Sequence, residues 1–265
     1  MTETAEIGIF GGSGFYEFAE SGVEEVSVET PYGPPSGPIA LMTVAGRRVA
    51  FLPRHGKEHS LPPHRVPYRA NLWAFKQLGV SRILAPSAVG SLQPQIAPGD
   101  FVVNDQFVDR TNGRPDTFYD GPEVVHVSSA DCYCPQIRQV AIDAAKANNV
   151  RVHETGTVAV IQGPRFSSKA ESRWFTQMGW DIVSMTQYPE VILARELALC
   201  YVTLSLVTDY DAGLVSGTAA VQAHDVLAVL AQNTENAKRV IKTMLANLPH
   251  ERLCSCADSL KYACL

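Results

Sequence analysis

Three short segments of the chain carry residue types that bind anions, and each directly follows a predicted strand. Residues 11–14 (Gly-Gly-Ser-Gly) offer backbone N–H groups and a hydroxyl, because glycines let the main chain approach a ligand closely. Residues 54–56 (Arg-His-Gly) offer a planar guanidinium that matches phosphate oxygens, with a histidine as a further donor. Residues 87–91 (Ser-Ala-Val-Gly-Ser) again combine small residues with hydroxyls. A tight turn or a surface salt bridge would explain a single segment, but three together predict that phosphate or a similar anion is a reactant.

Two further segments predict a different chemistry. In residues 163–167 (Gly-Pro-Arg-Phe-Ser), Phe166 could stack on a planar base, although packing in the core is the alternative for that ring. Asp209 ends the most apolar predicted strand, where desolvation raises the pKa of a carboxyl group. A raised pKa is what a general acid needs near neutral pH. A solvated Asx turn is the alternative interpretation, and it fits Asp211 better than Asp209.

The spacing of the histidines and cysteines does not favour a metal site. His55, His59 and His64 cannot share one helix face, because Gly56 and two prolines interrupt the segment. The six cysteines include two C-x-C pairs, 132/134 and 254/256, and zinc sites more often use C-x₂-C to C-x₄-C spacing. We therefore predict no metal and expect most cysteines to be buried thiols. A local redox or disulfide role for the tail pair stays open.

The elements that must position these segments alternate between strands and helices. Apolar spacing and capping signals predict helices that begin at Tyr68 and Pro135, one that follows Ser168, and a last helix over about 225–248. Several predicted strands are continuous apolar runs, which suits strands covered on both faces. These features predict one α/β domain, residues 1–265, with a central mixed sheet flanked by helices. The predicted strands are 7–10, 26–29, 39–44, 49–53, 82–86, 101–104, 157–161, 181–184 and 201–208.

Composition excludes several classes of protein. Hydrophobic residues make up 46% of the 265 residues, so a sizeable core can form and intrinsic disorder is excluded. The net charge of −5 argues against a nucleic-acid-binding surface and against a basic membrane-surface helix. No apolar run is long enough for a transmembrane helix, and the acidic N-terminus has no secretory signal. We predict a cytoplasmic protein without nucleic-acid or membrane partners.

The segments that carry the predicted chemistry resemble the trimeric branch of the purine nucleoside phosphorylase family, and within it the 5′-methylthioadenosine phosphorylases. Gly-Pro-Arg-Phe-Ser-Ser followed by Ala-Glu-Ser, at 163–172, is the most specific of the matching segments. The resemblance implies a nucleoside phosphorylase-like fold, a pentosyltransferase activity, and inorganic phosphate as co-substrate with no cofactor. The matching segments are 11–14, 54–56, 87–92, 98–100, 105–111, 118–121, 163–172, 185–186, 189–190 and 208–211.

The resemblance also implies roles for individual residues. Asp209 and Asp211 would be catalytic, with a protonated Asp209 giving its proton to N7 of the departing base. A neighbouring subunit of a homotrimer would contribute His126 to the pocket around the 5′ end. Phosphate would be held by Ser13, Arg54, His55, Ser87, Ala88 and Thr186. The nucleoside would contact Phe166, Ser167, Val183, Met185, Asp209, Asp211, His126, His224, Val226 and Leu227.

Two functions of this family remain open at the level of sequence. Asp209 favours a 6-aminopurine, since members that prefer 6-oxopurines carry asparagine there. The first function is phosphorolysis of 5′-methylthioadenosine to adenine and 5-methylthioribose 1-phosphate. The alternative is phosphorolysis of adenosine or other 5′-modified purine nucleosides, which a pocket-facing His224 would favour and an apolar pocket of Val226 and Leu227 would oppose. A non-catalytic nucleoside-binding protein would tolerate damage to Arg54, His55 or Asp209. A metal-dependent hydrolase would require the histidine cluster.

Overall fold

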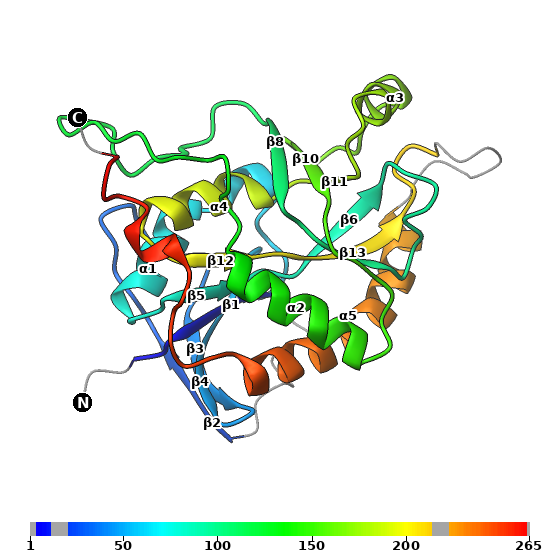
Figure 1. Ribbon diagram of the computed structural model, residues 1–265. Helices are drawn as coiled ribbons and strands as arrows, with labels where there is room; N and C mark the ends of the chain where they lie inside the picture. Colours follow the sequence, from blue (N-terminus) through cyan, green and yellow to red (C-terminus); the bar gives the residue numbers. More distant parts are fainter. Residues whose placement is uncertain (1–3, 12–20, 214–222, 264–265) are drawn as a thin grey trace.

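The fold alternates strands and helices, which confirms the predicted α/β class. Figure 1 shows the computed structural model, which describes residues 4–11, 21–213 and 223–263, with side chains of the last helix described from residue 229 onward. The helices are α1 (Tyr68–Gln77), α2 (Pro135–Ala147), α3 (Lys169–Gln177), α4 (Gln187–Glu196) and α5 (Ala223–Asn247), with short 3₁₀ turns η2 (Pro63–Arg65) and η3 (Ser255–Asp258).

The described strands form two mixed sheets, where one central mixed sheet was predicted. The first sheet has the order β12-β5-β1-β4-β3-β2, and the second has the order β8-β10-β11-β6-β13-β7-β9. The first comprises β1 (Ile7–Gly11), β2 (Ser21–Val26), β3 (Ile39–Val44), β4 (Arg47–Pro53), β5 (Arg82–Leu84) and β12 (Cys200–Val202). The second comprises β6 (Ser87–Ser91), β7 (Phe101–Val103), β8 (Gln106–Arg110), β9 (Val152–His153), β10 (Thr157–Ile161), β11 (Ile182–Ser184) and β13 (Leu204–Asp209).

The chain passes from one sheet to the other at two adjacent places. The strand predicted at 201–208 is in fact two strands, β12 and β13, which belong to different sheets and are separated by Thr203. β5 and β6 make the same passage, so the segment predicted as a loop at 87–91 is a strand. β5 pairs with β12 in the first sheet, and β6 pairs with β13 in the second. Two neighbouring segments therefore join the sheets side by side.

The inner strands of the first sheet are buried on both faces, as their continuous apolar runs predicted, whereas the edge strand β2 is largely exposed. Along β1, Ile7 and Ile9 belong to one core cluster, which includes α2 and α5, whereas Phe10 belongs to another, which includes α1 and α4. Residues of β4 alternate in the same way, with Phe51 in the first cluster and Leu52 in the second. Figure 1 shows α1 and α4 on one side of the strands and α2 and α5 on the other.

The remaining differences lie in elements with weak sequence signals. The prediction did not include α4, β8 or β9, and the strand placed at 26–29 lies at Ser21–Val26. The start of α3 is as predicted: the Ser168 hydroxyl accepts from the Glu171 N–H, and the Glu171 carboxylate accepts from the Ser168 N–H.

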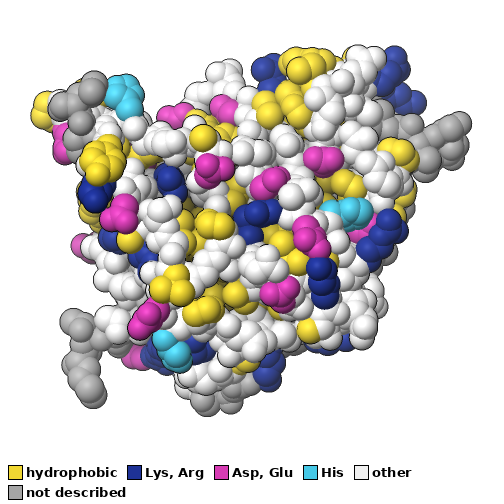
Figure 2. All heavy atoms as spheres, in the orientation of Figure 1, with side chains coloured by type: hydrophobic (Ala, Val, Ile, Leu, Met, Phe, Trp, Pro, Cys, Tyr) yellow, Lys and Arg dark blue, Asp and Glu magenta, His cyan; other side chains and the backbone are white. Residues whose placement is uncertain are grey.

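Figure 2 shows the distribution of charged side chains on one face of the molecule. In Figure 2, basic and acidic side chains are interspersed over the visible face, without an extended area of either sign. Within the described parts of the chain, none of the helices combines the length and the apolar character that a membrane span needs.

Candidate active site

Two of the three predicted anion-binding segments, 54–56 and 87–91, lie beside the carboxyl end of β1. β1 pairs with both β4 and β5 in parallel, so the three chains leave the sheet at the same edge. The Arg54 N–H donates to the Gly11 carbonyl (3.1 Å), and Arg54 Nη1 donates to the Pro86 carbonyl (3.1 Å). Gly11 is the last described residue before Ser13, which lies outside the described residues. The structure thus brings the segments beginning at 54 and 87 together beside the end of β1.

Arg54 is buried and bound to a partner that the sequence did not assign. Its Nε and Nη2 atoms donate to the two carboxylate oxygens of Glu190 (2.5 and 3.1 Å), and Tyr201 donates to the same carboxylate (2.8 Å). Burial lowers the pKa of Arg54, but the Glu190 carboxylate outweighs that effect and the pKa is raised. A guanidinium has five N–H groups. Among the described residues, Glu190 and the Pro86 carbonyl accept from three of these N–H groups. Two N–H groups of Arg54 therefore remain for an anion.

His55 is neutral, which changes its predicted role. Its Nδ1 lies 2.8 Å from the Leu61 carbonyl, and because a carbonyl only accepts, Nδ1 carries the hydrogen. Burial, followed by the charge of Arg54, lowers the pKa of His55 to about 4. The ring therefore presents an unprotonated Nε2 near neutral pH. The sequence predicted that His55 would donate a hydrogen bond to an anion. In the structure its Nε2 is an acceptor instead, which would suit a protonated oxygen of phosphate.

Two hydroxyls lie close together next to these groups, one on β6 and one just before α4. Ser87 Oγ and Thr186 Oγ1 lie 3.4 Å apart, and both residues are buried. Ser87 begins β6 and Thr186 precedes α4, so neither hydroxyl depends on a flexible loop. Ala88 follows Ser87 on β6, and its side chain is exposed.

Asp209 stands at the other end of the site, where β13 is irregular. The pairing of β13 with β6 shifts register between Val207 and Asp209, and such a bulge re-aims the side chains that follow it. Asp209 Oδ2 accepts from the Thr208 hydroxyl and Oδ1 from the Asp211 N–H, both at 2.7 Å. Burial raises the pKa of Asp209 to about 6 despite these two bonds. The predicted perturbation of this carboxyl is confirmed.

Asp211 is not the solvated turn residue that the sequence favoured. It is 3% exposed, and its φ of 46° lies in the left-handed region. The Asx turn belongs to Asp209, whose side chain accepts from the N–H two residues later. Burial raises the pKa of Asp211, and the nearby Ser172 and Ser167 hydroxyls oppose that rise. Asp211 Oδ2 and both serine hydroxyls are buried together, and both hydroxyls interact with the carboxyl group of Asp211.

The side chain of Phe166 is exposed at the surface. The alternative that this ring packs in the core is therefore wrong. The Phe166 side chain is 41% exposed. Arg165 makes two bonds of 2.7 Å to Glu171, which also caps α3, so the segment around Phe166 is held to that helix. Gly163, at φ +62°, lies so close to Met185 that an added Cβ would meet its sulfur at 2.6 Å.

Arg114 joins the segment around Gln162 to the segment around Met185 by hydrogen bonds, and this residue was not predicted from the sequence. Its Nη1 donates to the carbonyls of Met185 (2.9 Å) and Tyr188 (2.6 Å), and Nη2 donates to the Gln162 carbonyl (2.8 Å). It therefore fixes the segment before Thr186 against the one before Phe166. These partners lie 48 to 74 residues away in the chain, so local spacing gave no signal.

Gly90 leaves the space that Asp209 occupies, which gives a first prediction. A Cβ at this position would lie 3.0 Å from Asp209 Oδ1 and 3.2 Å from both Asp211 Cβ and Val183 Cγ1. Gly90→Ala should displace Asp209 and lower kcat roughly tenfold or more, since small misplacements of catalytic groups are costly. Steady-state kinetics against Gly37→Ala, whose Cβ would make only an ordinary 3.8 Å contact, checks this. Equal rates for both variants would contradict it.

Of the residues predicted around the 5′ end, only His126 has a described side chain on the surface. It is exposed, and its N–H donates to the Ala263 carbonyl (2.8 Å). Helix α5 includes His224, Val226 and Leu227, but the side chains of these three residues are outside the described part of the chain. Val183 lies on β11, and Met185 directly follows that strand. Val183 is close to Gly90, and Met185 is close to Gly163.

Three comparisons with known proteins agree with this geometry. The chain is 51% identical over 263 residues to the S-methyl-5′-thioadenosine phosphorylase of Thermofilum pendens, covering 98% of this chain and 99% of that protein. It is 52% identical over 266 residues to the purine nucleoside phosphorylase of Streptomyces coelicolor, covering 97% and 94%. A crystal structure of methylthioadenosine phosphorylase from an Antarctic soil metagenomic library superposes with a TM-score of 0.93 at 42% identity, covering 99% and 93%. The family model that describes the phosphorylase superfamily matches residues 6–246, and the chain belongs to that superfamily.

Proposed function

We propose that the protein catalyses the phosphorolysis of 5′-methylthioadenosine, giving adenine and 5-methylthioribose 1-phosphate. The observation that carries the proposal is the layout along β6. Ser87, with Arg54 and Thr186 beside it, begins the strand, and Gly90 lies against Asp209 three residues later. Three residues of strand span about 10 Å, which suits a phosphate at one end and a purine at the other, with the sugar between them.

The anion end of the site would hold phosphate below the sugar. The two remaining N–H groups of Arg54 and the hydroxyls of Ser87 and Thr186 would bind its oxygens. Unprotonated His55 would accept from a phosphate hydroxyl. As the glycosidic bond lengthens, positive charge develops on the sugar, and the phosphate held below stabilises it before it forms the new bond. Ser13 and the backbone at Ala88 are proposed to join this subsite.

The base end of the site would neutralise the departing purine. Protonated Asp209 would give its proton to N7, so that adenine leaves as a neutral molecule. Phe166 would stack on the purine, while Ser167, Val183 and the buried Oδ2 of Asp211 would contact its edge. The ribose would lie over Met185. A carboxyl group at position 209 can also accept from the exocyclic amino group of adenine, which favours a 6-aminopurine.

The 5′ pocket would be completed by a neighbouring copy of the chain. His126 is exposed and its backbone is hydrogen-bonded to the C-terminal segment, so we propose a homotrimer in which His126 reaches the next subunit's site. The chain's own contribution would be Val226 and Leu227, with His224 beside them. We further propose that residues 1–265 form a single catalytic domain and that the enzyme works in the cytoplasm.

The alternative substrate is adenosine or another 5′-modified purine nucleoside. One observation favours it: the purine nucleoside phosphorylase of Streptomyces coelicolor is as similar in sequence as the methylthioadenosine enzymes are. The two functions differ at the 5′ substituent, where a methylthio group needs an apolar pocket and a hydroxyl needs a hydrogen-bonding partner such as His224.

The test is phosphate-dependent release of the base from 5′-methylthioadenosine, adenosine and inosine, compared as kcat/KM. We expect a preference for methylthioadenosine over adenosine of more than tenfold, about 1.4 kcal/mol at the transition state. Equal or better use of adenosine would support the alternative and a pocket-facing His224. Inosine as the best substrate would contradict the role given to Asp209, and release without phosphate would contradict phosphorolysis itself.

A further inference from the structure

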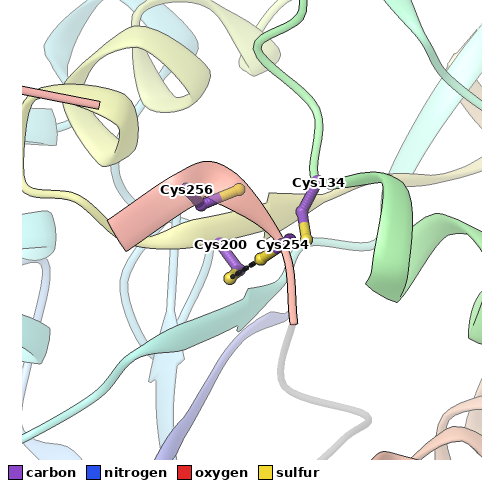
Figure 3. A group of neighbouring side chains, drawn as sticks. All are labelled: Cys134, Cys200, Cys254 and Cys256. Carbon is purple, nitrogen blue, oxygen red and sulfur yellow. Dashed lines mark hydrogen bonds between the residues drawn. The ribbon is translucent and has the colours of Figure 1, made fainter. Parts of the chain in front are cut away.

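Four cysteines from three distant parts of the chain meet in the core, away from the proposed active site. Cys134 immediately precedes α2, Cys200 begins β12, and Cys254 and Cys256 lie at the start of η3 near the C-terminus. Their sulfur atoms all lie within 4.8 Å of one another. Figure 3 shows the four side chains converging from these separate elements.

The spacing of the sulfurs suits a metal better than a disulfide. In a tetrahedral zinc site with Zn–S bonds near 2.3 Å, the sulfurs lie about 3.8 Å apart. Cys200 Sγ and Cys254 Sγ are 3.4 Å apart, far beyond the length of about 2 Å of a disulfide bond. Four thiols share one small volume, which closes the coordination sphere and leaves no position for a substrate, as in structural zinc sites.

The surroundings match the charge of such a site. Zn²⁺ bound by four thiolates carries two negative charges, and Cys134, Cys200 and Cys256 are buried, so that charge needs compensation. The buried guanidinium of Arg82 interacts electrostatically with Cys200, Cys254 and Cys134. Arg252, two residues before Cys254, has a buried Nε–H that lacks a partner within the described chain. Both cations fit an anionic metal centre.

We propose that Cys134, Cys200, Cys254 and Cys256 bind one Zn²⁺ ion that fastens the C-terminal segment to α2 and β12. The four thiols would release four protons to solvent as the ion binds. The segment that follows α5 is held by hydrogen bonds such as those from Arg82 to the His250 carbonyl (2.9 Å) and from Arg252 to the Ala198 carbonyl (2.8 Å), and the ion would add a further attachment. The narrow C-x-C pairs hid this site, because the ligands come from residues 134, 200 and 254–256 rather than from one local motif.

The first measurement is the zinc content of the full-length protein, purified without a metal-affinity tag and analysed by elemental and native mass spectrometry. We expect about one zinc per chain in the wild type. The double variant Cys254→Ser/Cys256→Ser should lose at least nine-tenths of it. Cys132→Ser is the matched control, because Cys132 is buried in the other core cluster and lies outside the group of four. It should keep the full zinc content.

A second measurement covers the case in which the double variant fails to fold. Zinc is removed from the wild type with a chelator under reducing conditions, and Co²⁺ is titrated in its place. We expect thiolate-to-cobalt charge-transfer bands and tetrahedral visible absorption that saturate at one Co²⁺ per chain, and a Tm several degrees lower for the metal-free form. Protein that holds no zinc and binds no Co²⁺ would overturn the proposal, as would a mass lower by four hydrogens, which indicates two disulfides, or a double variant with unchanged zinc content.

Discussion

Asp209→Asn should lower kcat/KM for the adenine nucleoside at least a hundredfold. Asparagine keeps the size of the side chain but has no proton to give, so the purine would leave as an anion. Proton transfer in the transition state contributes about 10²- to 10⁴-fold. The check is steady-state kinetics at saturating phosphate, with Asp143→Asn, on the exposed face of α2, as the control that should behave as the wild type. A loss below tenfold would contradict the role of Asp209 as the acid.

The pH dependence of the same variant tests the assignment independently. Because the pKa of Asp209 is raised to about 6, its acid form dominates below that pH and is lost above it. The wild-type kcat/KM should therefore fall as the pH rises through about 6. The Asn variant should lack this limb, which separates Asp209 from the titration of phosphate, since phosphate titrates in both proteins.

Asp209→Asn should raise the stability of the protein above about pH 6 even though it lowers the activity. A carboxyl pKa raised from 3.8 to about 6 means that ionisation is less favourable in the folded protein than in the unfolded chain. The free energy of unfolding should fall as the pH rises from about 4 to about 6, by about 3 kcal/mol in total. The Asn variant avoids this loss, so at pH 8 it should be more stable than the wild type, and at pH 4 the two should match. A variant that loses both activity and stability at pH 8 would indicate general disruption.

Glu190→Ala should destabilise the fold by about 3 to 5 kcal/mol, because it leaves the buried guanidinium of Arg54 without its counter-charge. Glu190 is fully buried and binds two nitrogens of Arg54. The KM for phosphate should also rise, since the carboxylate fixes the direction of the two N–H groups that remain. Urea denaturation and phosphate kinetics measure the two effects.

A double variant distinguishes the cost of an unpaired buried charge from other effects of removing Glu190. Replacing a buried ion pair with apolar residues of similar volume is often neutral or stabilising. Arg54→Met/Glu190→Leu should therefore recover most of the lost stability, while phosphorolysis should become undetectable because Arg54 is gone. If the double variant is as unstable as Glu190→Ala, the cost does not come from an unpaired charge. If it retains activity, Arg54 does not bind the phosphate.

The sequence singled out Arg54 and Asp209, which are proposed to act on the substrates, but not the residues that hold them in place. Arg54 and Asp209 stand out because their types and their positions after apolar strands are local features. Glu190 lay within a matching segment, yet its bond to Arg54 joins residues 136 positions apart, and no local pattern encodes that distance. Arg114 was missed for the same reason.

Two errors in the fold have physical causes. Residues 201–208 form one apolar run, and an apolar run shows only that the strand is buried. It does not show whether the strand stays in one sheet, so the sequence contains no signal for the break at Thr203. Residues 87–91 are small and polar, with low strand propensity, yet they pair with β13 and β11 on both sides. Tertiary pairing decided their conformation.

The paired passage of the chain between the two sheets bears on how the enzyme can move. β5 and β12 enter the passage together, joined by the bond from the Ala85 N–H to the Val202 carbonyl (2.9 Å), and Ser87 and Ser205 leave it as paired residues. A doubled ribbon resists bending far more than a single strand, so the two sheets form one elastic body with no hinge between them. Arg54 is bonded to Pro86 within this ribbon. We therefore expect this ribbon to fix the spacing of the groups proposed to bind phosphate, and any opening that admits the nucleoside to come from segments at the periphery.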